Sequence, residues 1–155
     1  MSTVAFFCRH AEKAGGSRNP PLTAEGRAAA DAGGAWLAAQ GVNLRGVLHT
    51  DTRRTAETAA RVVAAAGARP AVVAVGAIPR TRNGLGPALD ALVAEAGGAV
   101  LLVGHGNHQR RVEADHGGAA FDVPEGHRGA IFRLERGPAG WVCTGAFSGA
   151  PARGG

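Results

Sequence analysis

The sequence predicts a three-layer α/β/α fold, in which helices cover both faces of a mostly parallel central sheet. Through the first two thirds of the 155 residues, short apolar segments alternate with longer, Ala-rich segments of helical pattern. Two of the apolar segments, at 3–8 and 99–103, are continuous runs, as in strands that are buried on both faces. These two strands are therefore expected at the centre of the sheet.

The first half of the chain is expected to contain two strands and two helices. The β-branched and aromatic residues of TVAFFC mark the strand at 3–8, and a second strand covers 46–49. Thr23 is a typical N-cap and Gly41 a typical residue after a helix, so a helix is predicted between them. The second helix is predicted over 52–66. Its expected buried face consists of small apolar residues: Ala56, Ala59, Ala60, Val63 and Ala64.

The second half continues the alternation. A strand at 71–75 is followed by a helix at 87–96, which leads to the apolar strand at 99–103. A short helix is expected to open at 105–108.

The C-terminal part predicts two further strands, at 129–135 and 140–146, on either side of a turn rich in Gly and Pro. The chain is expected to form one domain over 1–148, with a flexible tail at 149–155.

Composition excludes several classes of protein. Hydrophobic residues make up 45% and charged residues 19%, so an intrinsically disordered chain is excluded. No apolar run approaches the roughly 18 residues that a membrane span needs, and no signal peptide is expected. The two cysteines, Cys8 and Cys143, are too few for a disulfide framework. We therefore expect a cytoplasmic protein without a membrane partner.

The chain is basic, with 17 Lys and Arg residues against 12 Asp and Glu residues and a net charge of +5. Lys13 is the only lysine, and the other basic residues are arginine. An anionic partner, such as nucleic acid or a phosphorylated substrate, would favour this charge. The alternative is codon usage in a GC-rich genome, which the abundance of Ala and Gly supports for most arginines. No nucleic-acid partner is expected, because the aromatic residues that stack on bases are few.

Three groups of polar residues follow predicted strands, at the sheet edge where ligands bind in folds of this class. The first is Arg9-His10, which suits phosphate because imidazole attacks phosphorus and guanidinium binds phosphate oxygens. The second, at 50–59, opens a helix whose N-terminus attracts anions. The third is 104–107, where glycines around His105 let the backbone approach a ligand closely. Each group alone is equally compatible with a structural role.

Taken together and in this order, these groups resemble the histidine phosphatase superfamily, which has the phosphoglycerate mutase-like fold. The matching segments are FFCRHAEK at 6–13, PLTAEGRAAA at 21–30, HTDTRRTAETA at 49–59 and LLVGHGN at 101–107. The resemblance spans about residues 3–147. It is greatest to the small, single-domain bacterial branch that includes phosphohistidine phosphatases.

The resemblance implies roles for individual residues. His10 matches the nucleophile that becomes phosphohistidine, and Arg9 matches the first phosphate-binding arginine. Arg54 matches the second such arginine, whereas Arg53 falls on a variable position. His105 matches the second histidine of the pocket. These residues would form a cationic phosphate pocket that needs no metal and no other cofactor.

The expected protonation states follow from this chemistry. His10 must be neutral to attack, so its other ring nitrogen should donate to an acceptor such as a backbone carbonyl. His105 acts better as a cation, and a phosphate dianion would raise its pKa.

The sequence departs from the family pattern at the general acid. Many members carry a Glu after the third strand, but this chain has no acidic residue between Glu57 and Asp90. Glu12 is the carboxylate nearest to a motif and is the candidate proton donor. Alternatively, no carboxylate serves, because a good leaving group needs little protonation, or the activity is feeble or lost. The family's usual Ser-Pro is also replaced by Thr50-Asp51.

Further candidates surround the expected pocket. Lys13, Gly106 and Asn107 lie within or beside the motifs, and a loop after the third strand carries Arg80 and Arg82. They are candidates for contacts with phosphate or with a second anionic group of the substrate.

A metal site is not expected. The remaining candidate ligands have spacings that match no common metal-binding motif: His108, Asp115, His116 and His127.

The sequence thus predicts a metal-independent phosphatase that hydrolyses a phosphomonoester or a protein phosphohistidine through a phosphohistidine on His10. Its partner would be a phosphorylated small molecule or a phosphoprotein, and its oligomeric state is left open. The alternatives are a weak or inactive phosphate-binding member, and a member recruited to another reaction on a phosphorylated metabolite.

Overall fold

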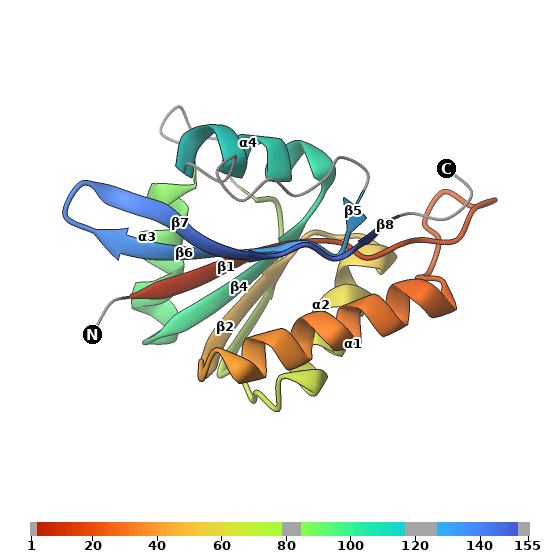
Figure 1. Cartoon of the computed structure of the whole chain (residues 1–155), viewed down its shortest axis with the longest axis horizontal. Coiled ribbons are helices and arrows are strands. Elements are labelled where there is room, and N and C mark those ends of the chain that lie inside the picture. Colours follow the sequence, from red (N-terminus) through yellow and green to blue (C-terminus); the bar gives the residue numbers. More distant parts are fainter. Residues whose placement is uncertain (1–2, 79–84, 117–126, 152–155) are drawn as a thin grey trace.

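A six-stranded sheet forms the centre of the computed structural model, which describes residues 3–78, 85–116 and 127–151 (Figure 1). Its strands are β1 (Val4–Arg9), β2 (Leu44–His49), β3 (Val72–Val75), β4 (Ala99–Gly104), β6 (Ile131–Gly137) and β7 (Gly140–Phe147). Their order across the sheet is β3-β2-β4-β1-β6-β7. The pairs from β3 to β1 are parallel, and the pairs formed by β6 with β1 and with β7 are antiparallel. The prediction of a mostly parallel sheet is therefore confirmed.

Helices cover both faces of this sheet, as predicted (Figure 1). In the described part of the chain, α1 (Ala24–Ala39) and α2 (Arg53–Ala65) pack on one face, and α3 (Gly86–Ala96) and α4 (Gly106–His116) pack on the other. Successive residues of β1 point to opposite faces, so Phe6 joins the core under α1 and α2, and Phe7 joins the core under α3 and α4. The three-layer arrangement follows directly from this alternation.

The two apolar runs predicted to be central do lie at the centre. β1 and β4 pair with each other, and each has a second neighbour on its other side. Their middle residues, from Ala5 to Cys8 and from Val100 to Val103, are buried. A continuous apolar run is what burial on both faces requires.

The caps predicted for α1 are confirmed. The backbone N–H of Gly26 donates to the hydroxyl of Thr23 over 2.9 Å, so Thr23 is the N-cap. Gly41 follows the helix with a φ of 70°, the left-handed conformation that glycine adopts without strain.

The predicted buried face of α2 is wrong. Its buried residues are Thr55, Thr58, Ala59 and Val62. Of the five residues predicted to be buried, only Ala59 is, whereas Ala60 and Ala64 are exposed. The buried face differs because it includes two threonines, Thr55 and Thr58. Inside the protein both threonine hydroxyls donate to backbone carbonyls, Thr55 to Thr50 and Thr58 to Arg54, each over 2.7 Å.

Three further elements differ from the expected boundaries. β2 begins at Leu44, two residues before the predicted strand. β3 begins at Val72, one residue after the predicted start, and it is an edge strand with Val73 and Val75 exposed. The short helix expected at 105–108 is the start of the longer helix α4.

The C-terminal stretch forms one more small pairing. Ala150–Pro151 (β8) pairs with His127–Arg128 (β5) in an antiparallel two-stranded sheet, within the stretch predicted to be a tail. Residues 152–155 lie outside the described residues. Among the described residues, no helix has both the length and the apolar character needed to cross a membrane.

Candidate active site

Two histidines meet where the central strands end. In the parallel register of β1 and β4, Arg9 lies opposite Gly104, so His10 and His105 leave the sheet side by side. The N–H of His10 donates to the carbonyl of Gly104 over 2.9 Å, which extends the pairing by one residue. The two imidazole rings have a centroid distance of 5.4 Å and an interplanar angle of 63°. This is the sheet edge at which the sequence predicted a ligand site.

His10 is buried and held in one tautomer. Its Nδ1 lies 2.8 Å from the carbonyl oxygen of Ala11. Because a carbonyl can only accept, Nδ1 carries the proton and Nε2 carries the lone pair. The pKa of His10 is lowered to about 3, mainly by burial and also by the charges of His105, Arg54 and Arg9, against the opposing effect of the backbone hydrogen bond. His10 is therefore neutral at neutral pH, as a nucleophile must be.

His105 is also neutral in the protein alone. Its pKa is lowered to about 4, mainly by burial and also by the charges of Arg54, His108 and Arg9. Its Nε2 lies 2.8 Å from the hydroxyl oxygen of Thr50. The sequence predicted a cation at this position once a phosphate dianion is bound. The surrounding positive charges show why the cation needs such an anion beside it.

The two predicted arginines lie beside these histidines. A Cβ on Gly106 would come within 2.8 Å of Nη2 of Arg9, so the glycine at the start of α4 leaves room for this guanidinium. Arg54 lies in the first turn of α2, and its buried Nε has no hydrogen-bond partner among the described residues. A cation at this end of a helix opposes the helix dipole, which an anion between the two would relieve.

Arg53 lies outside this group. Its side chain is 59% exposed and forms an ion pair with Glu57 over 3.2 Å. Its backbone N–H donates to the side chain of Asn19. The structure thus brings Arg54, and not Arg53, to the two histidines.

Buried threonines that sequence reasoning missed hold the site together. The fully buried hydroxyl of Thr58 accepts from the N–H of Ala11 over 3.0 Å and donates to the carbonyl of Arg54. It therefore joins the loop after β1 to the first turns of α2. A possible signal was the spacing of Arg54 and Thr58, because residues four apart lie on one side of a helix.

The remaining predicted residues are placed differently. Glu12 accepts from the hydroxyl of Thr23 over 2.9 Å, so its carboxylate is engaged at the start of α1. Lys13 is exposed and its backbone pairs with Leu22. Asn107 is exposed in the first turn of α4. Arg80 and Arg82 lie outside the described residues.

An open cavity of about 350 Å³ is lined by Thr50 and His108, which both contact His105. Its lining includes residues that follow β2 and β3 and one residue of α4: Thr50, Asp51, Gly76, Ala77, Ile78 and His108. Asp51 is exposed here and forms no hydrogen bond or ion pair with any described residue. The cavity therefore has room for a chemical group beside His105.

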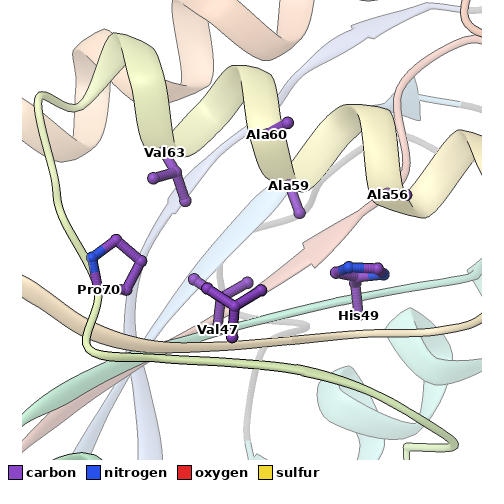
Figure 2. Close-up of a pocket in the computed structure, with 8 residues that line it drawn as sticks. Val47, His49, Ala56, Ala59, Ala60, Val63 and Pro70 are labelled. Carbon is purple, nitrogen blue, oxygen red and sulfur yellow. The ribbon is translucent and has the colours of Figure 1, made fainter.

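A second groove has a different character. Figure 2 shows this groove between α2 and the β2–β3 edge. Its volume is about 250 Å³. Its lining is apolar except for His49, whose Nδ1 donates to the carbonyl of Thr50 over 3.0 Å. With no cationic group aimed into it, this groove does not suit a phosphate.

Other histidines have structural partners. His116 is buried against the carbonyl of Trp141, and His127 donates to the carbonyl of Ser148. Within the described ranges, no three His, Cys, Asp or Glu side chains lie together as metal ligands would.

Known protein families and solved structures agree with this arrangement of residues. The model of the histidine phosphatase superfamily, branch 1, matches residues 5–75. This segment contains His10, Arg9 and Arg54. The resemblance to the superfamily that the motifs predicted is thereby confirmed. No curated protein sequence gives a significant match.

Solved structures extend the likeness to nearly the whole chain. The protein histidine phosphatase SixA in complex with tungstate aligns with a TM-score of 0.72 and 21% identity, over 94% of this chain and 96% of that chain. SixA from Agrobacterium tumefaciens gives 0.69 and 18%, over 95% and 98%. A mycobacterial glucosyl-3-phosphoglycerate phosphatase gives 0.62 and 17%, over 98% and 100%. The predicted phosphoglycerate mutase-like fold is thus confirmed.

The affinity for a tetrahedral dianion should rise as the pH falls from about 8 to about 5. The pKa of His105 is about 4 in the protein alone, and a bound dianion raises it, so binding takes up a proton. Sulfate stays a dianion throughout this range and is a suitable probe. Calorimetric titration should show a gain of up to about tenfold per pH unit, the limit for one linked proton. The variant His105→Asn should lose most of this dependence, and a flat profile for the unaltered chain would contradict the assignment.

Arg54 should contribute more to anion binding than its neighbour does. Arg54→Ala should weaken sulfate binding by about 1.5–3 kcal/mol, the range for a hydrogen bond to a charged group. Arg53→Ala removes an exposed ion pair and should change the affinity much less. The two variants alter the same residue type at adjacent positions, so they control for net charge. The reverse ranking would show that the motif is misaligned.

Proposed function

We propose that this protein is a metal-independent phosphatase that works through a phosphohistidine on His10. The observation that carries the proposal is the state of His10: a buried neutral imidazole, held through Nδ1 by Ala11 and surrounded by His105, Arg9 and Arg54. A histidine with its lone pair on Nε2 suits nucleophilic attack on phosphorus. The neighbouring arginines suit the charge on the oxygens of the transferred group.

The reaction has two steps. In the first, Nε2 of His10 attacks phosphorus, a P–N bond forms, and the P–O or P–N bond to the leaving group breaks. The leaving group takes the bonding electron pair and then a proton. In the second step, water attacks the phosphorus, the P–N bond to His10 breaks, and inorganic phosphate leaves. Each step keeps the nonbridging oxygens of the phosphoryl group beside Arg9, Arg54 and His105, so one cationic pocket serves both.

The substrate class is a phosphomonoester or a protein phosphohistidine. Two likenesses support it: SixA, described as a protein histidine phosphatase, binds tungstate, and a second neighbour of the same fold is a sugar-phosphoglycerate phosphatase. Tungstate is a tetrahedral oxyanion like phosphate. A chain of this length matches SixA almost end to end, so no long insertion is available to close over the pocket. This favours a protein-borne substrate or a small, loosely held one.

We assign the leaving group to the cavity beside Thr50, and its proton donor to Asp51. The sequence favoured Glu12 as the donor, but the carboxylate of Glu12 accepts the hydroxyl hydrogen bond of Thr23. Asp51 is the one carboxylate among the described residues that line the cavity. The same cavity is lined by the segment directly after β3, where the family's usual Glu would be expected.

The second candidate function is a phosphate-binding member with weak or no turnover. It is favoured by the absence of any acidic residue between Glu57 and Asp90. The two functions differ in one measurable species, because only a phosphatase forms phosphohistidine.

His10→Ala should lower phosphatase turnover of an aryl phosphate by at least about a thousandfold, because no nucleophile remains. After rapid mixing and acid-free quenching, the unaltered chain should carry a phosphohistidine at His10 and the variant should carry none. Circular dichroism should show that the variant keeps its fold. Unchanged turnover in the variant would refute the mechanism, and a chain that binds sulfate yet never becomes phosphorylated would favour the second candidate.

Asp51 should matter most for substrates with a poor leaving group. Asp51→Asn should slow phenyl phosphate about a hundredfold, within the range for general acid catalysis, and should slow 4-nitrophenyl phosphate only a few-fold. Glu12→Gln should slow both substrates equally and slightly. Asp115→Asn, which removes an exposed carboxylate paired with Arg111, is the matched control.

Two results would overturn this assignment. A leaving-group dependence in Glu12→Gln but not in Asp51→Asn would return the donor role to Glu12. The same small loss for both substrates in both variants would mean that no carboxylate donates the proton.

A further inference from the structure

We infer that Thr50 is a positioning residue, whose hydroxyl holds His105 through Nε2–H and thereby leaves Nδ1 as the nitrogen that gains a proton when a phosphate dianion binds. The role of Thr50 in catalysis rests on the proposed function. The tautomer of His105 rests on the geometry of the hydrogen bonds alone.

Thr50 occupies its place because of the sheet. β2 lies next to β4, with His49 opposite Val103, and the N–H of Thr50 donates to the carbonyl of Val103 over 3.3 Å. Thr50, the residue after β2, is thereby held beside Val103, which lies two residues before His105. The hydroxyl of Thr50 then lies 2.8 Å from Nε2 of His105.

The direction of the hydrogen bonds can be worked out from the donors available. The hydroxyl of Thr55 donates to the carbonyl of Thr50 over 2.7 Å, which uses its only proton. Toward the hydroxyl of Thr50, 3.0 Å away, Thr55 can therefore only accept. We assign the proton of Thr50 to this bond, in which Thr50 is the donor, so Thr50 accepts from His105. Nε2 of His105 consequently carries a hydrogen.

Thr52 completes this assignment. Its hydroxyl accepts from the N–H of Thr55 and keeps its own proton to donate to the hydroxyl of Thr55 over 2.7 Å. Thr55 then accepts two hydrogen bonds and donates one, which satisfies the hydroxyl fully. Thr55 is fully buried and Thr50 is 9% exposed, so these two hydroxyls are largely shielded from water.

The groups around His105 make this one hydrogen bond important. Arg9 and His10 face it from the end of β1, Arg54 from α2, and His108 from α4. These groups are cationic or neutral. Nδ1 of His108 accepts from the backbone N–H of His105, not from its ring. Among the described residues, Thr50 is therefore the only side chain that forms a hydrogen bond with the ring.

The consequence is a defined path for one proton. With Nε2–H held by Thr50, the proton that His105 gains with an anion must go to Nδ1. Without the hydroxyl, Nε2–H would lack its acceptor, and the ring would be free to exchange tautomers or to turn. Both changes would weaken the charge that His105 supplies to the transferred phosphoryl group.

The test compares Thr50→Val, which has nearly the shape of threonine without the hydroxyl, with Thr50→Ser, which keeps the hydroxyl. The ring nitrogens of His105 in the full-length chain are read by ¹⁵N NMR, with His105→Asn used to assign the signals. The unaltered chain and Thr50→Ser should show the Nε2–H tautomer in the absence of anion. On addition of sulfate, both should gain a proton on Nδ1. Thr50→Val should show mixed tautomers and weaker proton uptake.

Kinetics supply the second readout. Thr50→Val should lower kcat for 4-nitrophenyl phosphate about ten- to a hundredfold with a smaller change in KM, and Thr50→Ser should restore most of it. Thr144→Val makes the same chemical change at an exposed position of β7 and should alter neither readout. A structural role alone would lower stability in Thr50→Val without moving the tautomer signals.

The outcomes separate the inference from the proposed function. An Nδ1–H tautomer in the unaltered chain, or unchanged nitrogen signals and kcat in Thr50→Val, would overturn the inference. If the chain cleaves no aryl phosphate but shows the expected tautomer shift with sulfate, the positioning role stands and the phosphatase proposal fails.

Discussion

The parallel pairing of β1 with β4 is the constraint on which the site depends. It sets Arg9 opposite Gly104, and the residue that follows each strand is a histidine, His10 after β1 and His105 after β4. The pairing is made by backbone groups deep in the core, between residues with side chains that are fully buried. The two rings are therefore brought together by the sheet itself rather than by a flexible loop. β2 pairs with β4 from the other side and delivers Thr50 to the same edge.

The electrostatics of this edge favour an anion. Two arginines and two histidines lie together, and the pKa values of both histidines are lowered to about 3 and about 4. The histidines avoid mutual repulsion by staying neutral, whereas arginine cannot lose its charge. A tetrahedral dianion would offset the charge of Arg9 and Arg54 and favour the protonated form of His105. The proposed nucleophile, His10, and the proposed cation, His105, are thus the same residue type in different surroundings: Ala11 holds one ring, and Thr50 holds the other.

Uncharged hydroxyls provide the rigidity of this site. Thr58 ties the loop after β1 to α2, and Thr55 ties the start of α2 to the residue after β2. A buried carboxylate in either place could not donate to the backbone carbonyls of Thr50 and Arg54, and it would add a negative charge close to Arg54 in the chain. Threonine satisfies the same backbone groups and leaves the arginine for the anion. Gly106 likewise leaves the guanidinium of Arg9 in place, because a side chain at this position would collide with it.

The sequence by itself determined the fold class, the central strands, the caps of α1 and the motifs that bear Arg9, His10, Arg54 and His105. These features are local: apolar runs, cap residues and short motifs are each readable within about ten residues. It placed the wrong face of α2 inward, because the burial of Thr55 and Thr58 depends on backbone acceptors that lie elsewhere in the fold. Tertiary structure alone turned Glu12 toward Thr23, left Asp51 lining a cavity, and set Thr50 against His105, 55 residues away in the chain. A hydrogen bond between side chains depends on angles and distances that only the packed strands and helices establish, so no local pattern predicts it.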